Sequence, residues 1–450
     1  MSKPFRPYAP GQSFLLPPSP LEWLPEDHLA YFILEVVAGL ELAEIYAYYE
    51  KEGRGQPPHD PRMMVALLVY GYCVGVPSSR KIEKKTHEDV AFRVIAGNTH
   101  PDHTCISEFR RIHLQALAKL FVQVLRLCQA AGLVKLGNVA LDGTKVKANA
   151  SKHKAMSYKR MKEEEDRLNA KVAELLRAAA QADAAEDAEY GTRRRGDELP
   201  EELRRAETRR ERIRQIKAEL EAEARAQLDA AEQKPEDEPP ADGPTPLPSH
   251  RIPTTADGTP TDKAQRNFTD AESRIQKTGD GYVQGYNCQA AVDAEHQIVV
   301  AQAVTNQPPD VEHLVPMVER VIDNCGNAPS CVTADAGYFS AVNAAALACG
   351  GIDAYIATGR KKHDGAQPTA QEPSTDSPTV KEMMAWKLAT PAGRAVYARR
   401  KVIVEPAFGQ IKNRGFRQFL LRGLAKVRGE WALMTMTHNL LKLHGALRPA

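Results

Sequence analysis

The sequence predicts a mixed α/β unit that is preceded by an all-α unit and interrupted by a long helical insertion. Three observations indicate this class. Apolar residues recur with helical spacing from about residue 20 to residue 132, within a unit that we assign to residues 1–132. Short strand-like and helical segments alternate in residues 133–158 and again in residues 267–450. Residues 159–233, between them, are rich in Glu, Arg, Lys and Ala, a composition typical of long helices.

The first unit, residues 1–132, contains four helical segments separated by Pro, Gly and Asn. Its third and fourth helices are joined by "NTHPDH" and have the layout of a helix-turn-helix DNA reader. In that hypothesis the unit binds DNA, with Arg110, Arg111 and His113 facing the duplex. The alternative is an ordinary helical bundle with a solvated basic face.

The insertion, residues 159–233, is predicted to form two long helices that break near "EYGTRRRGDELP". Their thin apolar stripe needs a partner, which is either the other helix or a second protomer. A further alternative is a hairpin that clamps DNA through residues 193–195. Residues 234–266 and a second stretch at about 361–380 are rich in Pro and polar residues, so we expect a disordered tether and a flexible insertion there.

The α/β unit begins with a strand in "NVALDGTKV" and continues after the insertion. Two strands surround the turn at 293–296, and a helix, a strand, a helix, a strand and a C-terminal helix follow. This is the order of elements in ribonuclease-H-like folds. We therefore predict a mixed five-stranded sheet with flanking helices.

The charge is distributed unevenly along the chain. The net charge is only +2, but residues 394–450 carry twelve Lys and Arg residues against Glu405 and Glu430 alone. Such a basic segment indicates a polyanionic partner. The seven cysteines include no CxxC pair, which argues against a zinc site or a disulfide framework. No signal peptide and no membrane span are evident, so a soluble cytoplasmic protein is expected.

Three carboxylates stand out by their positions. The first predicted strand ends in Asp142 and the fourth in Asp335, and Glu405 lies in the basic C-terminal segment. Carboxylates that meet at adjacent strand ends repel unless a cation lies between them. Hard divalent ions such as Mg²⁺ bind carboxylate oxygens, and phosphodiester chemistry commonly uses two of them. The sequence therefore predicts a two-metal site, in which Lys145 and Lys147 bind phosphate.

Each carboxylate also has a structural interpretation. A lone Asp at a strand end usually caps a turn, and "ADAGY" around Asp335 fits an Asx turn. Glu405 precedes Pro406 and is compatible with a helix start. Asp293 and Glu295 are assigned to a hairpin turn, although Asp293 is the best substitute acid if one of the three fails.

Several segments resemble a known family. "LDGTKVKANAS", "NCQAAVD", "ADAGYFS" and "RRKVIVEPAFGQIKNRGFRQF" are similar to bacterial insertion-sequence transposases of the DDE type, in the group typified by insertion sequence 1182. "WLPEDHLAYFILEVV" and "HEDVAFRVIAGNTHPDHTCISEFRR" resemble the N-terminal domain of the same transposases. The resemblance covers nearly all of the chain except the helical insertion and the tethers.

The resemblance implies a catalytic and metal-binding triad of Asp142, Asp335 and Glu405. It also implies a lysine seven residues beyond the glutamate, which Lys412 supplies on nearly the same helix face. The tyrosine and arginine of the family pattern match less well: Ala398 and Lys401 stand at those places, and Tyr397 and Arg400 are each one place off. The basic residues Arg400, Lys401, Lys412 and Arg414 are expected to bind DNA.

The resulting hypothesis is a transposase that binds the ends of its element, cleaves phosphodiester bonds with two Mg²⁺ ions and joins the 3′-hydroxyls to target DNA. Mn²⁺ is expected to substitute for Mg²⁺. Double-stranded DNA is the expected partner, and a homodimer or larger assembly is expected on it, in a bacterial cytoplasm at the nucleoid. The alternatives are a ribonuclease-H-like nuclease without strand transfer and a domesticated DNA-binding protein.

Overall fold

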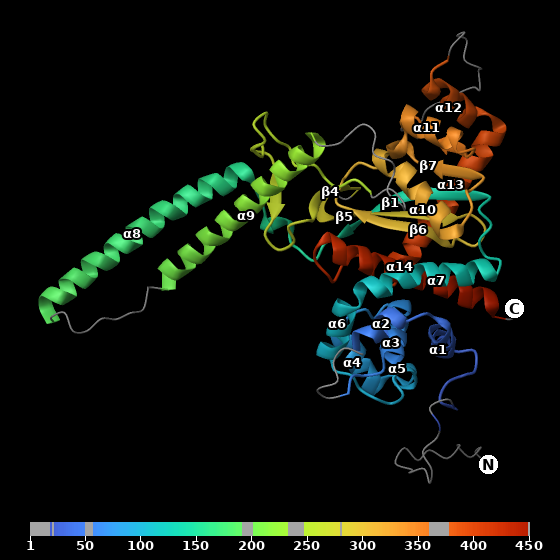
Figure 1. The fold of residues 1–450 in the computed structure, drawn as a ribbon, viewed down its shortest axis with the longest axis horizontal. Coiled ribbons are helices and arrows are strands. Elements are labelled where there is room, and N and C mark those ends of the chain that lie inside the picture. Colours follow the sequence, from blue (N-terminus) through green and yellow to red (C-terminus); the bar gives the residue numbers. More distant parts are fainter. Residues whose placement is uncertain are drawn as a thin grey trace, which may run out of the picture. The chain divides into compact units, whose positions relative to one another are not determined.

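The computed structural model describes residues 19, 22–49, 57–190, 201–232, 247–279, 281–359 and 378–448 (Figure 1). The chain divides into two compact units. The first comprises residues 1–134, 409–416 and 432–450, and the second comprises residues 135–408 and 417–431. Two C-terminal segments thus group with the N-terminal helices, whereas the sequence placed all of residues 267–450 in the α/β unit. Among the described residues, no helix is long and apolar enough to cross a membrane.

The first unit is all-helical, as predicted, but has more helices than the four expected. Those of its N-terminal part are α1 (Leu29–Gly39), α2 (Ala43–Tyr49), α3 (Pro61–Cys73), α4 (Ser79–Glu88), α5 (Val90–Ile95), α6 (His103–Ile112) and α7 (Leu114–Ala130). Asp60 starts α3 by accepting hydrogen bonds from the amides of Arg62 (2.7 Å) and Met63 (3.1 Å). The long helix expected after "NTHPDH" is instead broken at His113, between α6 and α7.

The positions of Arg110 and His113 correct the expectation that both face a duplex. Arg110 is only 6% exposed and donates hydrogen bonds to the carbonyl of Pro77 (2.7 Å) and the hydroxyl of Ser79 (3.1 Å). His113 is equally buried, beside the hydroxyl of Tyr49, and burial lowers its pKa. These side chains hold the helices of the first unit together. Arg111 is exposed, as expected, and pairs with Glu108 one turn earlier.

The second unit is built on a six-stranded sheet. Its strands are β1 (Asn138–Lys147), β4 (Arg274–Thr278), β5 (Gly281–Asp293), β6 (Val299–Thr305), β7 (Cys331–Ala334) and β8 (Asp353–Ile356). β1 is central, antiparallel to β5 and parallel to β7, while β8 continues the sheet beside β7. Both β4 and β6 pair with β5. Apart from the extra strand β4, this confirms the predicted ribonuclease-H-like order.

Helices pack on this sheet and complete the core. They are α10 (Leu314–Cys325), α11 (Ala341–Cys349), α12 (Val380–Ala389), residues 391–408 of α13 (Pro391–Asn413) and residues 424–431 of α14 (Leu424–Leu447), with short 3₁₀ turns η3 (Val311–His313) and η4 (Ala336–Tyr338). α10 contacts β5 and β6, and α11 contacts β8. Trp431 of α14 is buried and donates from its indole nitrogen to the carbonyl of Gln289 on β5 (3.1 Å). This contact fixes α14 to β5, the strand beside the one that carries Asp142.

The predicted helical insertion is confirmed as a hairpin. α8 (Tyr158–Tyr190) and α9 (Glu201–Glu232) lie side by side and antiparallel (Figure 1). Their apolar stripes pack against each other, since Met161, Leu168 and Val172 of α8 share one cluster with Leu203 and Ile213 of α9. The stripe is thus buried within one chain. Residues 193–195, the proposed clamp, lie outside the described residues.

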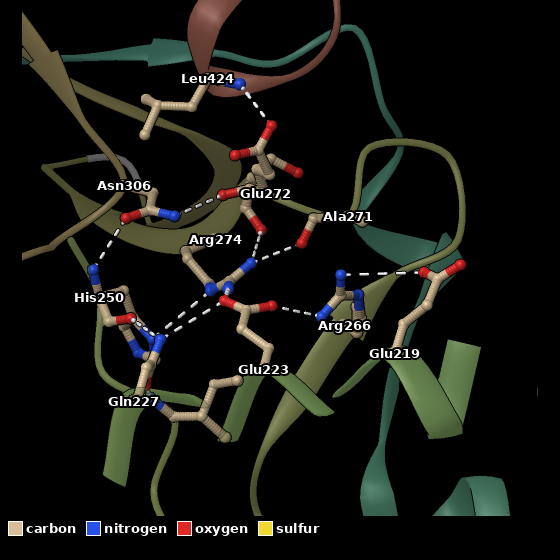
Figure 2. Close-up of polar contacts among 12 residues, drawn as sticks. Glu219, Glu223, Gln227, His250, Arg266, Ala271, Glu272, Arg274, Asn306 and Leu424 are labelled. Carbon is tan, nitrogen blue, oxygen red and sulfur yellow. Dashed lines mark hydrogen bonds and ion pairs between the residues drawn. The ribbon is translucent and has the colours of Figure 1, made fainter. Parts of the chain in front are cut away.

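The hairpin is anchored to the sheet by a buried polar network (Figure 2). Glu223 near the end of α9 accepts from Arg266 on β3 (2.5 Å) and from Arg274 on β4 (3.5 Å). Both arginines are less than a tenth exposed. β3 (Gln265–Asn267) forms a two-stranded sheet with β2 (Ala155–Ser157), next to the 3₁₀ turn η2 (Lys152–Lys154). Because buried charges are costly to unpair, this network fixes the root of the hairpin.

The described half of the expected tether is ordered. Within residues 247–266, Ile252 and Ala264 pack with Leu220 and Ala224 of α9, and the carbonyl of His250 and the amide of Ile252 bond to the Gln227 side chain. The prediction of disorder was wrong here because it used overall composition, which does not show that single apolar residues between the prolines pack against α9. Residues 233–246, and the flexible insertion expected at about 361–380 up to residue 377, lie outside the described residues.

Candidate active site

Two of the three predicted carboxylates lie close together on neighbouring strands, but the prediction that the first strand ends at Asp142 is wrong, because β1 continues to Lys147. β1 and β7 run parallel, with Leu141 opposite Ala334. Asp142 and Asp335 are the next residues on their strands, so the sheet register brings them to the same edge. Asp335 also caps η4, because its carboxylate accepts from the amide of Gly337 (2.8 Å). The Asx turn and the catalytic interpretation of Asp335 are therefore compatible.

Asp142 is the more enclosed of the two. Burial raises its pKa and the Asp335 carboxylate raises it further, while the guanidinium of Arg400 lowers it. Arg400 comes from α13 and donates to the Asp142 carboxylate (2.8 Å), with 9% of its side chain exposed. It also lies beside Tyr397, its guanidinium carbon 5.9 Å from the ring centroid. The two residues that were one place off the family pattern therefore lie at the site.

A third aspartate, Asp310, joins this edge and was missed by the sequence analysis. Its Oδ1 accepts hydrogen bonds from Asn287 (2.6 Å), Gln289 (2.9 Å) and Lys145 (3.3 Å). Lys145, expected to bind phosphate, is thus engaged with a carboxylate. The segment "NQPPD" before η3 carries no local signal for such a role, because the donors come from β1 and β5.

Tyr338 lies among the three aspartates. It is fully buried, and burial raises its pKa well above the ordinary value, with further increases caused by Asp310, Asp142 and Asp335. Its hydroxyl is therefore neutral and donates to the side chain of Gln289. The negative charges of all three carboxylates thus favour the neutral form of this phenol.

Two glycines permit this close approach. A Cβ atom at Gly143 would lie 2.6 Å from the amide nitrogen of Gln289 and 3.1 Å from the Asp310 carboxylate. At Gly337 it would lie 3.0 Å from Asp335 and 3.6 Å from Asp310. A side chain at either position would require the neighbouring polar side chains to shift, so the glycines leave these side chains room at the sheet edge.

A cavity of about 1130 Å³ opens beside Asp335 and Asp310. Its wall includes the α13 side chains Arg394, Arg400 and Lys401. A negative floor under a positive wall suits a phosphate group whose charge is shared with bound cations. Lys401, expected to bind DNA, is exposed at this wall.

Glu405, the third predicted acid, is exposed on α13 and outside the wall of the cavity. It follows Lys401 by four residues, so it lies on the same face of the helix. No hydrogen bond or ion pair is recorded between Glu405 and the rest of the described chain. In the described ranges, no group of three or more His, Cys, Asp and Glu side chains is close enough to hold a metal ion. The structure thus gathers the two aspartates but leaves Glu405 apart.

The surroundings of Asp142 nevertheless fit a divalent ion. Carboxylate oxygens are hard ligands, and the partly buried Asp142 and Asp335 raise the cost of two neighbouring negative charges. A cation, the guanidinium of Arg400, already contacts Asp142. Asp142 and Asp335 are therefore the residues best placed to hold metal. Asp310 is a further acid close to them in space, and Glu405 is a further acid on the α13 face that carries Lys401.

The remaining basic residues of the sequence hypothesis are dispersed. Lys147 is exposed at the end of β1. Lys412 is half-buried near the end of α13. Arg414 is largely enclosed in the first unit, where it donates to the hydroxyl of Thr437 (3.3 Å), and burial lowers its pKa. An enclosed guanidinium does not face DNA, so Arg414 is a packing residue in this structure. Asp293 is buried at the turn between β5 and β6, where its carboxylate accepts from the amide of Glu295 (3.1 Å), in agreement with the hairpin interpretation. It also accepts from the amides of Lys135 and Leu136 before β1.

Two family models match the chain. The one described as "Transposase domain (DUF772)" matches residues 18–111, and the one described as "Transposase DDE domain" matches residues 249–440. The chain belongs to the DDE transposases. It is accordingly a metal-dependent enzyme that cleaves DNA and transfers strands, and it binds DNA. These models do not distinguish the insertion sequence 1182 group. No curated protein and no solved structure matches the chain.

The matched ranges leave out the strand that carries Asp142. The DDE match begins at residue 249, after the hairpin, whereas β1 precedes it. In the transposase structure β1 is nevertheless the central strand, bonded to β5 on one side and β7 on the other. The insertion therefore separates the first carboxylate from the rest of the site along the chain but not in space.

We expect Asp310→Asn to slow DNA cleavage by the transposase by about 10- to 100-fold, the range typical of residues that position metal ligands. The amide keeps the shape of the side chain but loses the charge that Lys145 contacts. The measurement is the initial rate of DNA nicking with Mn²⁺, with thermal unfolding as a check on folding. The matched control is Asp323→Asn, an exposed aspartate on α10. Equal rates in the two variants would remove Asp310 from the site.

Proposed function

We propose that this transposase binds the ends of its element, cleaves them with two Mg²⁺ ions and joins the freed 3′-hydroxyls to target DNA. The observation that carries the proposal is the pairing of β1 with β7, which sets Asp142 and Asp335 side by side below the cavity wall that contains Arg394, Arg400 and Lys401. Mn²⁺ is expected to replace Mg²⁺, since both accept carboxylate and phosphate oxygens.

The carboxylates and the cations have separate tasks in this proposal. Asp142 and Asp335 hold the divalent ions, which activate the attacking oxygen and stabilise the leaving one. Lys145 and the side-chain amides of Asn287 and Gln289 keep Asp310 in place next to them. Arg394 and Lys401 on the wall bind the non-bridging oxygens of the phosphate. Glu405 completes the acidic set when DNA is bound, because it lies one turn from Lys401 on the same face of α13.

The two reactions share one site. In the first, a water oxygen attacks the phosphorus atom, the bond from phosphorus to the 3′ oxygen breaks, and the products are a 3′-hydroxyl and a 5′-phosphate. In the second, that 3′-hydroxyl attacks a phosphodiester of the target, so one ester bond forms as another breaks and no external energy source is needed. Both displacements place developing negative charge at the same edge of the sheet.

The decisive experiment incubates the purified transposase with Mn²⁺ or Mg²⁺, DNA that carries the element ends and a target plasmid. We expect cleavage at the ends and joined products, both abolished by a chelator. Cleavage without joining would indicate a nuclease, and end binding without cleavage a domesticated DNA-binding protein. The size of the complex on end DNA, measured by light scattering, tests the proposed dimer or larger assembly.

A further inference from the structure

A basic groove of about 560 Å³ lies where α9 of the hairpin passes the β2–β3 sheet. Ala155, Met156, Ile213 and Phe268 supply its apolar lining. The polar lining is almost entirely cationic and contains no carboxylate. It consists of His153, Lys154, Arg160, Arg204, Arg205, Thr208, Arg209 and Arg212. This density of positive charge requires an explanation, because like charges held together repel each other.

The arginines follow one face of α9. Arg204, Thr208 and Arg212 recur every four residues, and Arg205 and Arg209 lie beside them. At 1.5 Å per residue, the row from Arg204 to Arg212 is about 12 Å long. Phosphates along one strand of a duplex are about 3.4 Å apart in the axial direction, so the row spans roughly three or four of them.

Part of this charge forms no ion pair with a carboxylate in the part of the chain that the structure describes. Among the described residues, Lys154, Arg160 and Arg204 form no ion pair with a carboxylate. Arg212 donates only to neutral groups, the side chain of Gln215 (3.0 Å) and the carbonyl of Phe268 (3.5 Å). Their charge remains available to a polyanion.

Two other arginines of the groove form ion pairs with carboxylates. Arg205 contacts Glu201 one turn earlier, and Arg209 contacts Glu164 of α8 (2.9 Å). Glu164 is also held by Arg167. These pairs stabilise the hairpin, and they leave Arg204 and Arg212, at the two ends of the row, as its arginines without an ion pair to a described carboxylate.

The apolar lining of the groove belongs to the core of the hairpin, and Phe268 is its one aromatic side chain. Met156 and Phe268 pack against the buried cluster that joins α8 to α9. Proteins that bind single strands present aromatic faces to the bases, and this groove presents guanidinium groups. Planar guanidinium groups suit bidentate contacts with phosphate oxygens.

The hairpin can hold such a groove in a fixed position. Its apolar stripe is buried between α8 and α9. The ion pairs of Glu223 with Arg266 and Arg274 attach its base to β3 and β4 (Figure 2). A rigid element with a cationic row loses little conformational entropy when it binds an extended anion.

We propose that this groove binds the sugar–phosphate backbone of duplex DNA, with Arg204 and Arg212 as its main contacts. The proposal rests on the action of this protein on DNA, and it assigns the inserted hairpin a part in that action that is separate from the acidic site. Because the contacts are to phosphates, the binding is independent of base sequence.

The test compares full-length wild-type protein with Arg204→Ala/Arg212→Ala on a fluorescent duplex of about 30 base pairs with arbitrary sequence. Fluorescence anisotropy at several salt concentrations gives the affinity and its salt dependence. We expect the double variant to bind at least about ten-fold more weakly, and the slope of log affinity against log salt to fall by about 1.8, or 0.9 for each lost phosphate contact. The variant Arg204→Lys/Arg212→Lys should keep most of the slope.

The matched control is Arg177→Ala/Arg225→Ala, which removes two exposed arginines of the same hairpin outside the groove. Circular dichroism confirms that each variant folds. Unchanged affinity and slope in the groove variant, or an equal loss in the control, would overturn the proposal. A groove variant that loses affinity for polyglutamate but not for DNA would also overturn it, in favour of an acidic protein partner.

The same variant separates this proposal from the proposed function. We expect it to retain Mn²⁺-dependent cleavage when DNA is supplied in excess, because its acidic site is intact. An inactive wild-type protein that binds DNA through the groove would refute the catalytic proposal and leave this one standing.

Discussion

The Asp335→Asn transposase is expected to cleave DNA at least about a thousand-fold more slowly than the wild-type enzyme and to bind it with unchanged affinity. Asparagine retains the oxygen that accepts from the amide of Gly337, so the turn after β7 survives. The substitution removes the charge that would hold a divalent ion. We expect the same result for Asp142→Asn and for Glu405→Gln. The measurements are single-turnover cleavage with Mn²⁺ and equilibrium binding of the same DNA.

The control for these variants is Glu295→Gln, which changes an exposed carboxylate in the turn between β5 and β6. It should cleave at the wild-type rate. The three catalytic variants test different steps of the argument. The assignment of Asp142 and Asp335 to the triad depends on the sheet register, whereas the assignment of Glu405 depends on its helix face and on the resemblance to the family. Cleavage close to the wild-type rate by one variant would remove that residue from the triad, and Asp310 would then be the next acid to test in its place.

The second large effect is expected from Arg110→Ala, which should reduce the free energy of unfolding of the first unit by about 2–4 kcal/mol. Truncation leaves a cavity where the buried stem lay and deprives the carbonyl of Pro77 and the hydroxyl of Ser79 of their donor. Hydrogen exchange in the full-length protein measures the effect, because protection of α3, α4 and α6 reports local unfolding.

Its neighbour Arg111 provides the contrast. Arg111 is exposed and paired only with Glu108 on the same helix, so Arg111→Ala should change stability by less than about 0.5 kcal/mol. If Arg111 contacts a phosphate of the element ends, Arg111→Ala will instead weaken DNA binding and reduce its salt dependence by about 0.9. Similar hydrogen-exchange protection in both variants would contradict the buried role of Arg110.

The sequence alone determined the order of the elements. Helical spacing identified the first unit and the hairpin, and strand-like segments identified β1, β5, β6, β7 and β8, because such patterns are local. The same order predicted Asp142 and Asp335 at strand ends, which holds for Asp335 after β7, whereas β1 continues beyond Asp142 to Lys147. The strand β4 was missed because it is short, largely polar and paired with only one end of β5. Arg110 was misplaced because helical spacing in the first unit did not show which basic face is buried.

The tertiary structure decided what lies around the carboxylates. Asp310 follows two prolines and meets its donors only when β1 and β5 are paired. Arg400 and Lys401 are adjacent in sequence but about 100° apart on a helix, and only the packing of α13 shows that the first contacts Asp142. The basic groove joins residues near 155, 210 and 268. Contacts between segments so distant along the chain depend on sheet register and helix packing, which local sequence patterns do not encode.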